Sequence, residues 1–252
     1  MDVSGSMELW PSLPERPLER PLERPPERAA EYVPVPARAI PSDRLVTLSY
    51  AVVDVETTGG SPWLGHRVTE IAAVVVRDGQ IAETFDTLVN PERSIPPFIT
   101  RLTHITAAMV SDQPIFRDVS PRLLDLLRGH VFVGHNAAFD RRFVQAEVER
   151  AGGALPSGRT LCTVRLARRL LPHLRRRSLD HVAHHYGVML GDRHRAMGDA
   201  RATAHCLIRM LDDVGSLGLD TWADMQQLLG ARRPRRGRPS AMPRGGMWEV
   251  GA

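Results

Sequence analysis

The sequence predicts an α/β domain built on a mixed β-sheet with helices on its flanks. Three observations favour this fold class. Three strand-like segments follow one another at the start of the domain, apolar strands then alternate with helical segments, and 42% hydrophobic residues suit a globular core. At 252 residues the chain has room for one ordinary domain with an extension at each end.

The first three strands are predicted to form an antiparallel meander. Segment Leu48–Glu56 is rich in valine and reads as an interior strand. Val68–Val76 follows as a second strand, and Asp78-Gly79 then turns the chain into a third, Ile81–Val89. Two residues of the Asp-Gly type are typical of a tight hairpin, so these strands are expected to pair in sequence order.

Strands and helices alternate in the rest of the domain. A helix around Val119–Leu127 precedes an apolar strand at Val131–Val133, and Asn136 is expected to cap the next helix. A short strand near Thr160–Thr163 brings the sheet to five strands, in which an antiparallel meander is followed by parallel strands. Three more helices are expected around residues 164–171, 179–186 and 200–211.

These elements place the folded domain at residues 44–213. Residues 1–43 contain a repeated Pro-Leu-Glu-Arg unit, and proline at this density predicts a disordered arm that is either a plain linker or a docking segment. Residues 214–230 are expected to hold a short amphipathic helix. Residues 231–252 are expected to form a basic disordered tail, which is either merely solvated or adds nonspecific contacts to phosphates.

Composition limits the cellular setting and the class of partner. The formal net charge is +4, and all 33 basic residues are arginine, which suits a polyanionic partner but also fits a GC-rich genome. Cys162 and Cys206 lack the spacing of a redox or metal motif and are expected to be apolar fillers. No apolar run long enough for a bilayer and no secretory signal are visible, so a cytoplasmic protein without a membrane partner is expected.

Four acidic residues and one histidine lie near the ends of these elements. Asp54 and Glu56 are two apart on one strand and therefore share a face. Asp140 falls in the first turn of the helix after the fourth strand, while Asp199 opens the last helix and His194 lies in the loop before it. Adjacent buried carboxylates repel each other unless a cation holds them, and ligands of open α/β sheets collect at strand ends. The pattern predicts a divalent-metal site.

Three short segments carry a family resemblance: Asp54-Val-Glu56-Thr-Thr-Gly59, His135-Asn136-Ala-Ala-Phe-Asp140 and His194-Arg-Ala-Met-Gly-Asp199. Over approximately Leu45–Leu211 they resemble, in the same order, the motifs of the DnaQ-like 3′-to-5′ exonucleases of the DEDDh group. This family includes the epsilon proofreading subunit of bacterial DNA polymerase III. The resemblance implies a ribonuclease H-like fold. It also implies a hydrolase that removes nucleoside 5′-monophosphates from the 3′ end of single-stranded DNA during DNA replication or repair.

The resemblance also assigns roles to individual residues. Asp54, Glu56, Asp140 and Asp199 are expected to hold two divalent cations, Mg²⁺ or Mn²⁺, with Asp54 bridging them, and His194 is expected to be the general base. Hard cations prefer carboxylate oxygens, and imidazole titrates near neutral pH, so these residue types suit metal-assisted hydrolysis.

Four further residues match family positions that handle the substrate. Thr57, Thr58 and Asn136 are expected near the terminal nucleotide, and His135 is expected to support their loop from behind. The chain departs from the family at Leu102-Thr-His-Ile-Thr106, where many relatives have Leu-His-Gly-Ile-Thr. Because that segment helps to seat bases in the family, base preference is open.

Several alternatives also stay open. An RNA-processing exonuclease of the same fold would act on RNA, although Thr57 stands where the oligoribonuclease branch usually has methionine. A catalytically idle module that tethers nucleic acid is a third reading, and the protein could act alone or with a DNA polymerase subunit. A zinc site built from His181, His184, His185 and Cys206 is disfavoured because these residues lack ordered ligand spacing.

Overall fold

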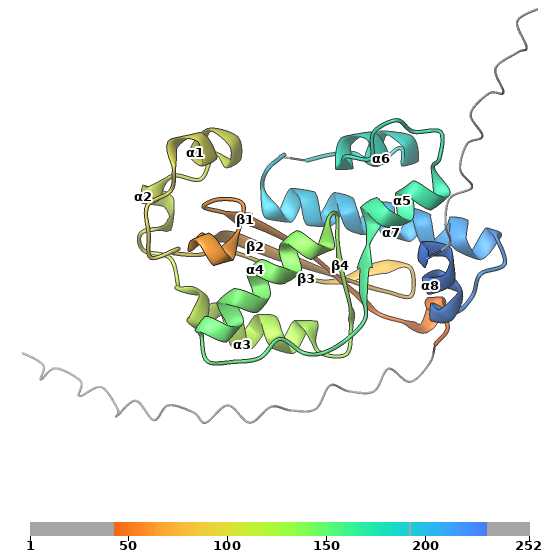
Figure 1. Ribbon diagram of the computed structural model, residues 1–252, viewed down its shortest axis with the longest axis horizontal. Coiled ribbons are helices and arrows are strands. Elements are labelled where there is room, and N and C mark those ends of the chain that lie inside the picture. Colours follow the sequence, from red (N-terminus) through yellow and green to blue (C-terminus); the bar gives the residue numbers. More distant parts are fainter. Residues whose placement is uncertain (1–42, 192, 231–252) are drawn as a thin grey trace, which may run out of the picture. The chain divides into compact units, whose positions relative to one another are not determined.

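The computed structural model of the protein describes residues 43–191 and 193–230. The strands of its sheet are β1 Tyr50–Thr57, β2 Val68–Arg77, β3 Gln80–Leu88, β4 Val131–Gly134 and β5 Thr160–Cys162. They lie in the order β3-β2-β1-β4-β5; β2 is antiparallel to both neighbours, and β4 is parallel to both β1 and β5 (Figure 1). The predicted five-stranded mixed sheet, with a meander followed by parallel strands, is confirmed.

The turn between β2 and β3 has the predicted hairpin chemistry. Asp78 and Gly79 both adopt left-handed backbone conformations, with φ of 52° and 70°. Two-residue hairpin loops need this combination, because its twist matches that of the flanking strands. The turn therefore joins the two strands that form the antiparallel edge of the sheet.

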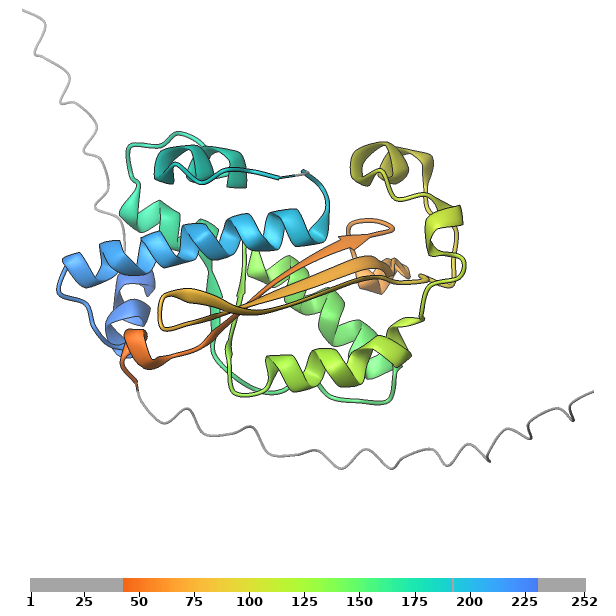
Figure 2. The ribbon, with the colours of Figure 1, turned by 180° about the vertical axis from the view of Figure 1, so that it is seen from behind.

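Helices cover both faces of the sheet. Side chains alternate along β1, so Tyr50 and Val52 enter one core while Ala51 and Val53 enter the other. The first core is shared with α5–α8 and the second with α3 and α4. Figure 1 shows the two layers, and Figure 2 shows from behind how α7 crosses the sheet. The bounds are α3 Phe116–Leu127, α4 Ala137–Arg150, α5 Thr163–Leu170, α6 Leu179–Tyr186, α7 Ala196–Ser216 and α8 Trp222–Gly230.

One helix start and one capping interaction differ from the sequence prediction. Helix α7 begins at Ala196 and not at Ala200, because the carboxylate of Glu70 in β2 accepts a hydrogen bond from the Ala196 amide at 2.9 Å. Asp199 therefore lies in the first turn of the helix and does not open it. Asn136 occupies the N-cap position of α4 with φ of 109°, but its side chain makes no capping hydrogen bond, so the capping interaction predicted for it was wrong.

Short helices between β3 and α3 were not predicted. They are α1, Pro97–Thr103, and α2, Ala107–Val110. Elements of seven and four residues complete at most two turns, which is too short for an apolar period to be recognised. Two 3₁₀ turns, Leu45–Thr47 and Pro62–Leu64, escaped prediction for the same reason.

The C-terminal helix belongs to the same core as the sheet. Trp222 and Met225 of α8 are buried, and the Trp222 amide donates to the Asp43 carbonyl at 2.7 Å. Helix α7 continues past residue 213, where the sequence placed the end of the domain. The predicted basic tail, 231–252, and nearly all of the predicted arm, 1–43, lie outside the described residues. Within the described ranges no helix is long and apolar enough to cross a bilayer, and cytoplasmic location stays a prediction.

Candidate active site

Strand β1 presents two carboxylates at its C-terminal end. Asp54 and Glu56 lie opposite Ala72 and Glu70 of β2 in the antiparallel register. They continue the row of Tyr50 and so face the side of the sheet that α7 covers. Both side chains are partly exposed, whereas their strand neighbours are buried. A ligand can therefore reach them from one end of the sheet.

Asp140 approaches the same strand from α4. It is 4% exposed, and its Oδ1 atom accepts a hydrogen bond from the Val55 amide at 3.3 Å. A Cβ atom placed on Gly134, at the end of β4, would lie 2.8 Å from Asp140 Oδ2 and 2.9 Å from the Cα of Ala137. Glycine is therefore required at residue 134 so that α4 can start close enough to bring its carboxylate to β1.

Helix α7 and the loop before it supply the remaining groups. Glu56, His194 and Asp199 each offer one potential ligand atom, and these three atoms lie within 4.8 Å of one another. His194 adopts a left-handed conformation with φ of 58°, one residue before the N-cap of α7. The structure thus brings together residues that are more than 130 positions apart in the sequence, and among the described residues no other group of acids, histidines or cysteines meets this distance criterion.

The pKa values in this cluster are raised. Removal from water, and then the nearby carboxylates of Asp140, Glu56 and Asp199, raise the pKa of Asp54 well above its usual range. Burial first and then the negative charges of Asp199 and Glu70 raise the pKa of Glu56 to about 8. Burial raises the pKa of Asp140 to about 7, against the opposing effect of its backbone hydrogen bonds. These carboxylates are short of positive charge, as expected of groups built to hold a cation.

The cluster already contains one positively charged side chain, which the sequence analysis did not identify. The Arg193 guanidinium donates to the carboxylate of Asp199 and, through Nε, to Asp180 Oδ1 at 2.7 Å. It therefore links the start of α6 to the acidic cluster. The only signal in the sequence is its place next to His194, which does not reveal the partners.

A second missed group holds the start of α7. Glu70, at 3% exposure, accepts two hydrogen bonds from Arg195 Nε at 3.1 Å, one from Arg195 Nη2 at 2.7 Å and one from the Ala196 amide. Arg195 and Ala196 lie between His194 and Asp199 on the chain. Glu70 is thus a positioning group that connects β2 to the segment carrying two candidate site residues.

The residues expected to handle the substrate lie around the same cluster. Thr57 donates to the Gly59 carbonyl at 2.7 Å, whereas Asn136 is exposed beside the start of α4. His135 lies 2.9 Å from both Thr163 Oγ1 and the Arg177 carbonyl, and burial lowers its pKa. Because a carbonyl can only accept, the ring donates from Nε2, and His135 ties its loop to the α5–α6 connection.

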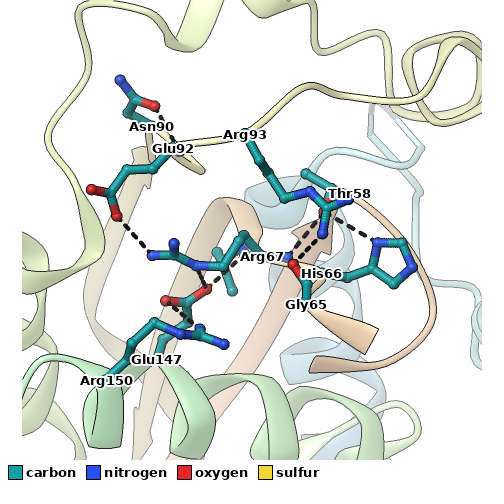
Figure 3. A network of polar contacts seen from close by, with 10 residues as sticks. Thr58, Gly65, His66, Arg67, Asn90, Glu92, Arg93, Glu147 and Arg150 are labelled. Atoms are coloured by element: carbon teal, nitrogen blue, oxygen red, sulfur yellow. Dashed lines mark hydrogen bonds and ion pairs between the residues drawn. The ribbon is translucent and has the colours of Figure 1, made fainter. Parts of the chain in front are cut away.

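A polar network fixes the chain that follows Thr58 (Figure 3). The Thr58 hydroxyl accepts from the Arg67 amide at 3.0 Å, while the Arg67 side chain donates to Glu147 Oε1 at 2.7 Å and to Glu92 Oε2 at 3.0 Å. Glu147 Oε1 also accepts from the Val68 amide at 3.2 Å. One buried acid of α4 therefore anchors the start of β2 and, through it, the loop that contains Thr58.

The departing segment Leu102–Thr106 spans the end of α1 and the start of α2. His104 takes the left-handed C-cap conformation of α1 that glycine adopts more easily, with φ of 60°. Thr106 caps α2 by accepting from the Met109 amide. The segment is thus an ordered turn despite its unusual sequence. The alternative zinc cluster finds no support among the described residues, in which Cys206 is fully buried.

Comparisons with known proteins agree with this geometry. The RNase T family of exonucleases matches residues 51–207. A PolC-type DNA polymerase III of Caldanaerobacter subterraneus is 37% identical over 73% of this chain and 13% of its own length, and the 3′-5′ exonuclease DinG of Bacillus subtilis is 37% identical over 71% and 19%. The chain therefore spans less than a fifth of either relative.

Solved structures show the same fold. Exonuclease X in complex with 5′ overhanging duplex DNA has a TM-score of 0.56 and 32% identity, covering 73% of this chain and 99% of that one. The nuclease domain of 3′hExo, a DEDDh family member bound to rAMP, has a TM-score of 0.57 at 20% identity, covering 68% and 95%. The predicted ribonuclease H-like architecture and the resemblance to DnaQ-like enzymes are confirmed, and the chain belongs to the RNase T family of exonucleases.

Proposed function

We propose that this protein is a metal-dependent exonuclease that hydrolyses phosphodiester bonds at the 3′ end of single-stranded DNA and releases nucleoside 5′-monophosphates. The observation that carries the proposal is the convergence of Asp54, Glu56, Asp140 and Asp199 with His194 at the end of β1. Similarity to exonuclease X, solved in complex with 5′ overhanging duplex DNA, and to the 3′-5′ exonuclease DinG supports an exonuclease that acts on DNA.

The donor set suits hard divalent cations. Carboxylates with raised pKa values and little positive charge around them fit Mg²⁺ or Mn²⁺, which prefer oxygen ligands. Asp54, Glu56, Asp140 and Asp199 would hold two such ions. When bound, the ions supply positive charge for the attacking and leaving oxygens of an in-line displacement.

His194 is proposed as the general base. It sits on the loop immediately before α7, beside Glu56 and Asp199, so its imidazole can take a proton from a water molecule held at the cluster. The Glu70 contacts to Arg195 and Ala196 hold this loop from the other side. In this arrangement His194 acts as the base, and the carboxylates are left to bind the cations.

The proposed place of the terminal nucleotide is beside Thr57, Thr58 and Asn136. Their backbone segments flank the acidic cluster at the ends of β1 and β4. His135 holds the loop of Asn136 from behind through Thr163 and the Arg177 carbonyl. A polymerase partner stays a prediction, since the relatives named after polymerase III are far longer than this chain.

A nuclease assay tests the proposal. A 5′-labelled DNA oligonucleotide should be shortened stepwise from its 3′ end in Mg²⁺ or Mn²⁺, with nucleoside 5′-monophosphates as products. Excess EDTA and Asp54→Ala should each abolish shortening. Asp125→Asn, a 62% exposed acid on α3, serves as the matched control and should act like the natural protein. Shortening that persists in EDTA or in Asp54→Ala contradicts the proposal.

The same assay separates the alternatives. Faster shortening of a matched RNA oligonucleotide would assign an RNA-processing role, because the two substrates differ chiefly at the 2′-hydroxyl. Binding without turnover in either metal would instead assign a tethering role. A mismatched 3′ end in duplex DNA tests whether proofreading substrates are preferred to free single strands.

A further inference from the structure

An acid-free stretch of chain runs from the end of α4 to the start of α6, and its last part contacts His135 beside the candidate active site. Residues 150–179 contain no aspartate or glutamate. The stretch holds eight arginines, namely Arg150, Arg159, Arg165, Arg168, Arg169, Arg175, Arg176 and Arg177. Three of them are consecutive in the connection between α5 and α6, residues 171–178, which we call the arginine loop. Adjacent like charges without acidic neighbours repel each other, so the arrangement favours an anionic ligand.

The arginine loop is anchored and not merely exposed. The Arg177 carbonyl accepts from His135 Nε2 at 2.9 Å, and the Arg177 side chain folds back to donate to the carbonyls of Leu171 and Pro172 at 3.1 and 3.2 Å. Arg177 is therefore used in holding the loop. Arg175 and Arg176 remain exposed, and within residues 43–191 and 193–230 neither side chain has an acidic partner.

The C-terminal end of the arginine loop is tied to the acidic cluster by two contacts. The Arg177 carbonyl accepts from His135, which belongs to the segment that leads through Asn136 into the helix of Asp140. Asp180, in the first turn of α6, binds the Arg193 guanidinium, which also binds Asp199. Arg175 and Arg176 thus directly precede a segment that is held against the site.

We propose that Arg175 and Arg176 form a contact site for the phosphate backbone of the nucleic-acid strand whose 3′ end occupies the acidic cluster. Guanidinium groups bind phosphate oxygens in pairs, and a strand that leaves the cluster carries one phosphate per nucleotide past the adjoining surface. The contacts are to phosphate and carry no base preference. This inference rests on the proposed function, because it assumes that the cluster receives a strand end.

Salt-dependent binding tests the contact site without turnover. A 5′-fluorescein oligothymidylate is titrated with the full chain in EDTA, and its anisotropy is followed at about 50 to 200 mM KCl. The double variant Arg175→Gln/Arg176→Gln should bind more weakly, and its slope of log K against log salt should be less steep by about 1.4, because each lost single-strand contact removes about 0.7. The ratio of the natural protein's binding constant to that of the variant should therefore fall about sevenfold across that salt range.

Two further variants serve as controls. Arg117→Gln/Arg122→Gln removes two exposed arginines from α3, on the other face of the sheet, and should keep the natural slope. Arg175→Lys/Arg176→Lys keeps both charges and should restore most of the slope. The basic segment 231–252 is the same in every variant, so its contribution cancels. Equal slopes for the glutamine variant and the natural protein would overturn the contact site.

A substrate without upstream phosphates separates this inference from the proposed function. The p-nitrophenyl ester of thymidine 5′-monophosphate should be hydrolysed equally by the natural protein and by Arg175→Gln/Arg176→Gln, since it does not reach the arginine loop. A natural slope with normal DNA hydrolysis refutes the contact site alone. If the glutamine variant has a reduced slope but the natural protein hydrolyses neither substrate, the contact site is supported and the exonuclease is refuted.

Discussion

Replacement of Glu147 by alanine should destabilise the domain more than the loss of any exposed acid on the same helix. The Glu147 side chain is 1% exposed, and its Oε1 atom accepts from Arg67 Nε at 2.7 Å and from the Val68 amide at 3.2 Å. Its Oε2 atom lies 3.3 Å from Arg150 Nη1 as an ion-pair contact. Alanine would leave the Arg67 guanidinium, whose side chain is 15% exposed, without its buried partner (Figure 3).

The expected size of the effect follows from these contacts. Removing one partner of a buried ion pair lowers the free energy of unfolding by about 3 to 5 kcal/mol. Arg67 keeps Glu92, a half-exposed acid at 3.0 Å, and retains some access to water, so the lower end of about 3 kcal/mol applies. For a domain of this size each kcal/mol lowers Tm by about 2 to 4 °C, which gives a drop of about 6 to 12 °C.

Thermal unfolding followed by circular dichroism in EDTA measures this difference. Glu149→Ala is the matched control, because Glu149 is exposed on the same helix and its carboxylate accepts, among the described residues, a hydrogen bond only from Gln145, so about 0.5 kcal/mol or less should be lost. The double variant Arg67→Ala/Glu147→Ala should be destabilised by less than the sum of the single variants. A Glu147→Ala protein that melts within about 2 °C of Glu149→Ala would refute the reasoning.

Three other outcomes are expected. His194→Ala should lower turnover about a hundredfold or more while Mn²⁺ affinity by calorimetry hardly changes; equal losses would make His194 a metal ligand. Glu70→Ala should cost about 1 to 3 kcal/mol, because the Ala196 amide loses its acceptor and Arg195 loses its ion pair with Glu70, and should slow turnover; unchanged melting and turnover would rule out positioning. In EDTA, stability should fall as pH rises from 4.5 toward about 8, since folded Glu56 keeps a proton that the unfolded chain has lost. Mn²⁺ should remove this decline, and a Tm that rises with pH in EDTA would contradict the raised pKa.

Local patterns were sufficient to predict the sheet. The valines of β1 and β2 and the turn at Asp78-Gly79 determine strands and hairpin within a few residues of sequence, and the structure has them within one or two positions of the prediction. The carboxylates of the site were found in the same way, because Asp54 and Glu56 interrupt a strand that is otherwise buried. An acidic residue within an apolar strand can therefore be recognised from its immediate sequence neighbours.

The contacts that hold the site cannot be recognised in this way. Glu70 and Ala196 are separated by 126 residues, and Arg67 and Glu147 by 80, so only the folded chain brings each pair together. The early start of α7 likewise depends on a contact between residues far apart in the sequence. Its first amide donates to Glu70 of β2, and its N-cap residue makes no side-chain hydrogen bond. Helix limits fail where tertiary contacts replace local caps.

Glu70 and Glu147 solve a problem that the acidic cluster creates. Unpaired carboxylates at the end of β1 oppose folding when no cation is bound, so the segments around them need fixing by other means. Each of the two buried acids accepts hydrogen bonds from an arginine side chain and from the first backbone amide of an element. Glu147 binds the Val68 amide of β2, and Glu70 binds the Ala196 amide of α7. Glu147 and Glu70 thereby fix the first residues of β2 and α7, so the carboxylates of Asp54 and Glu56 can keep their places without a cation.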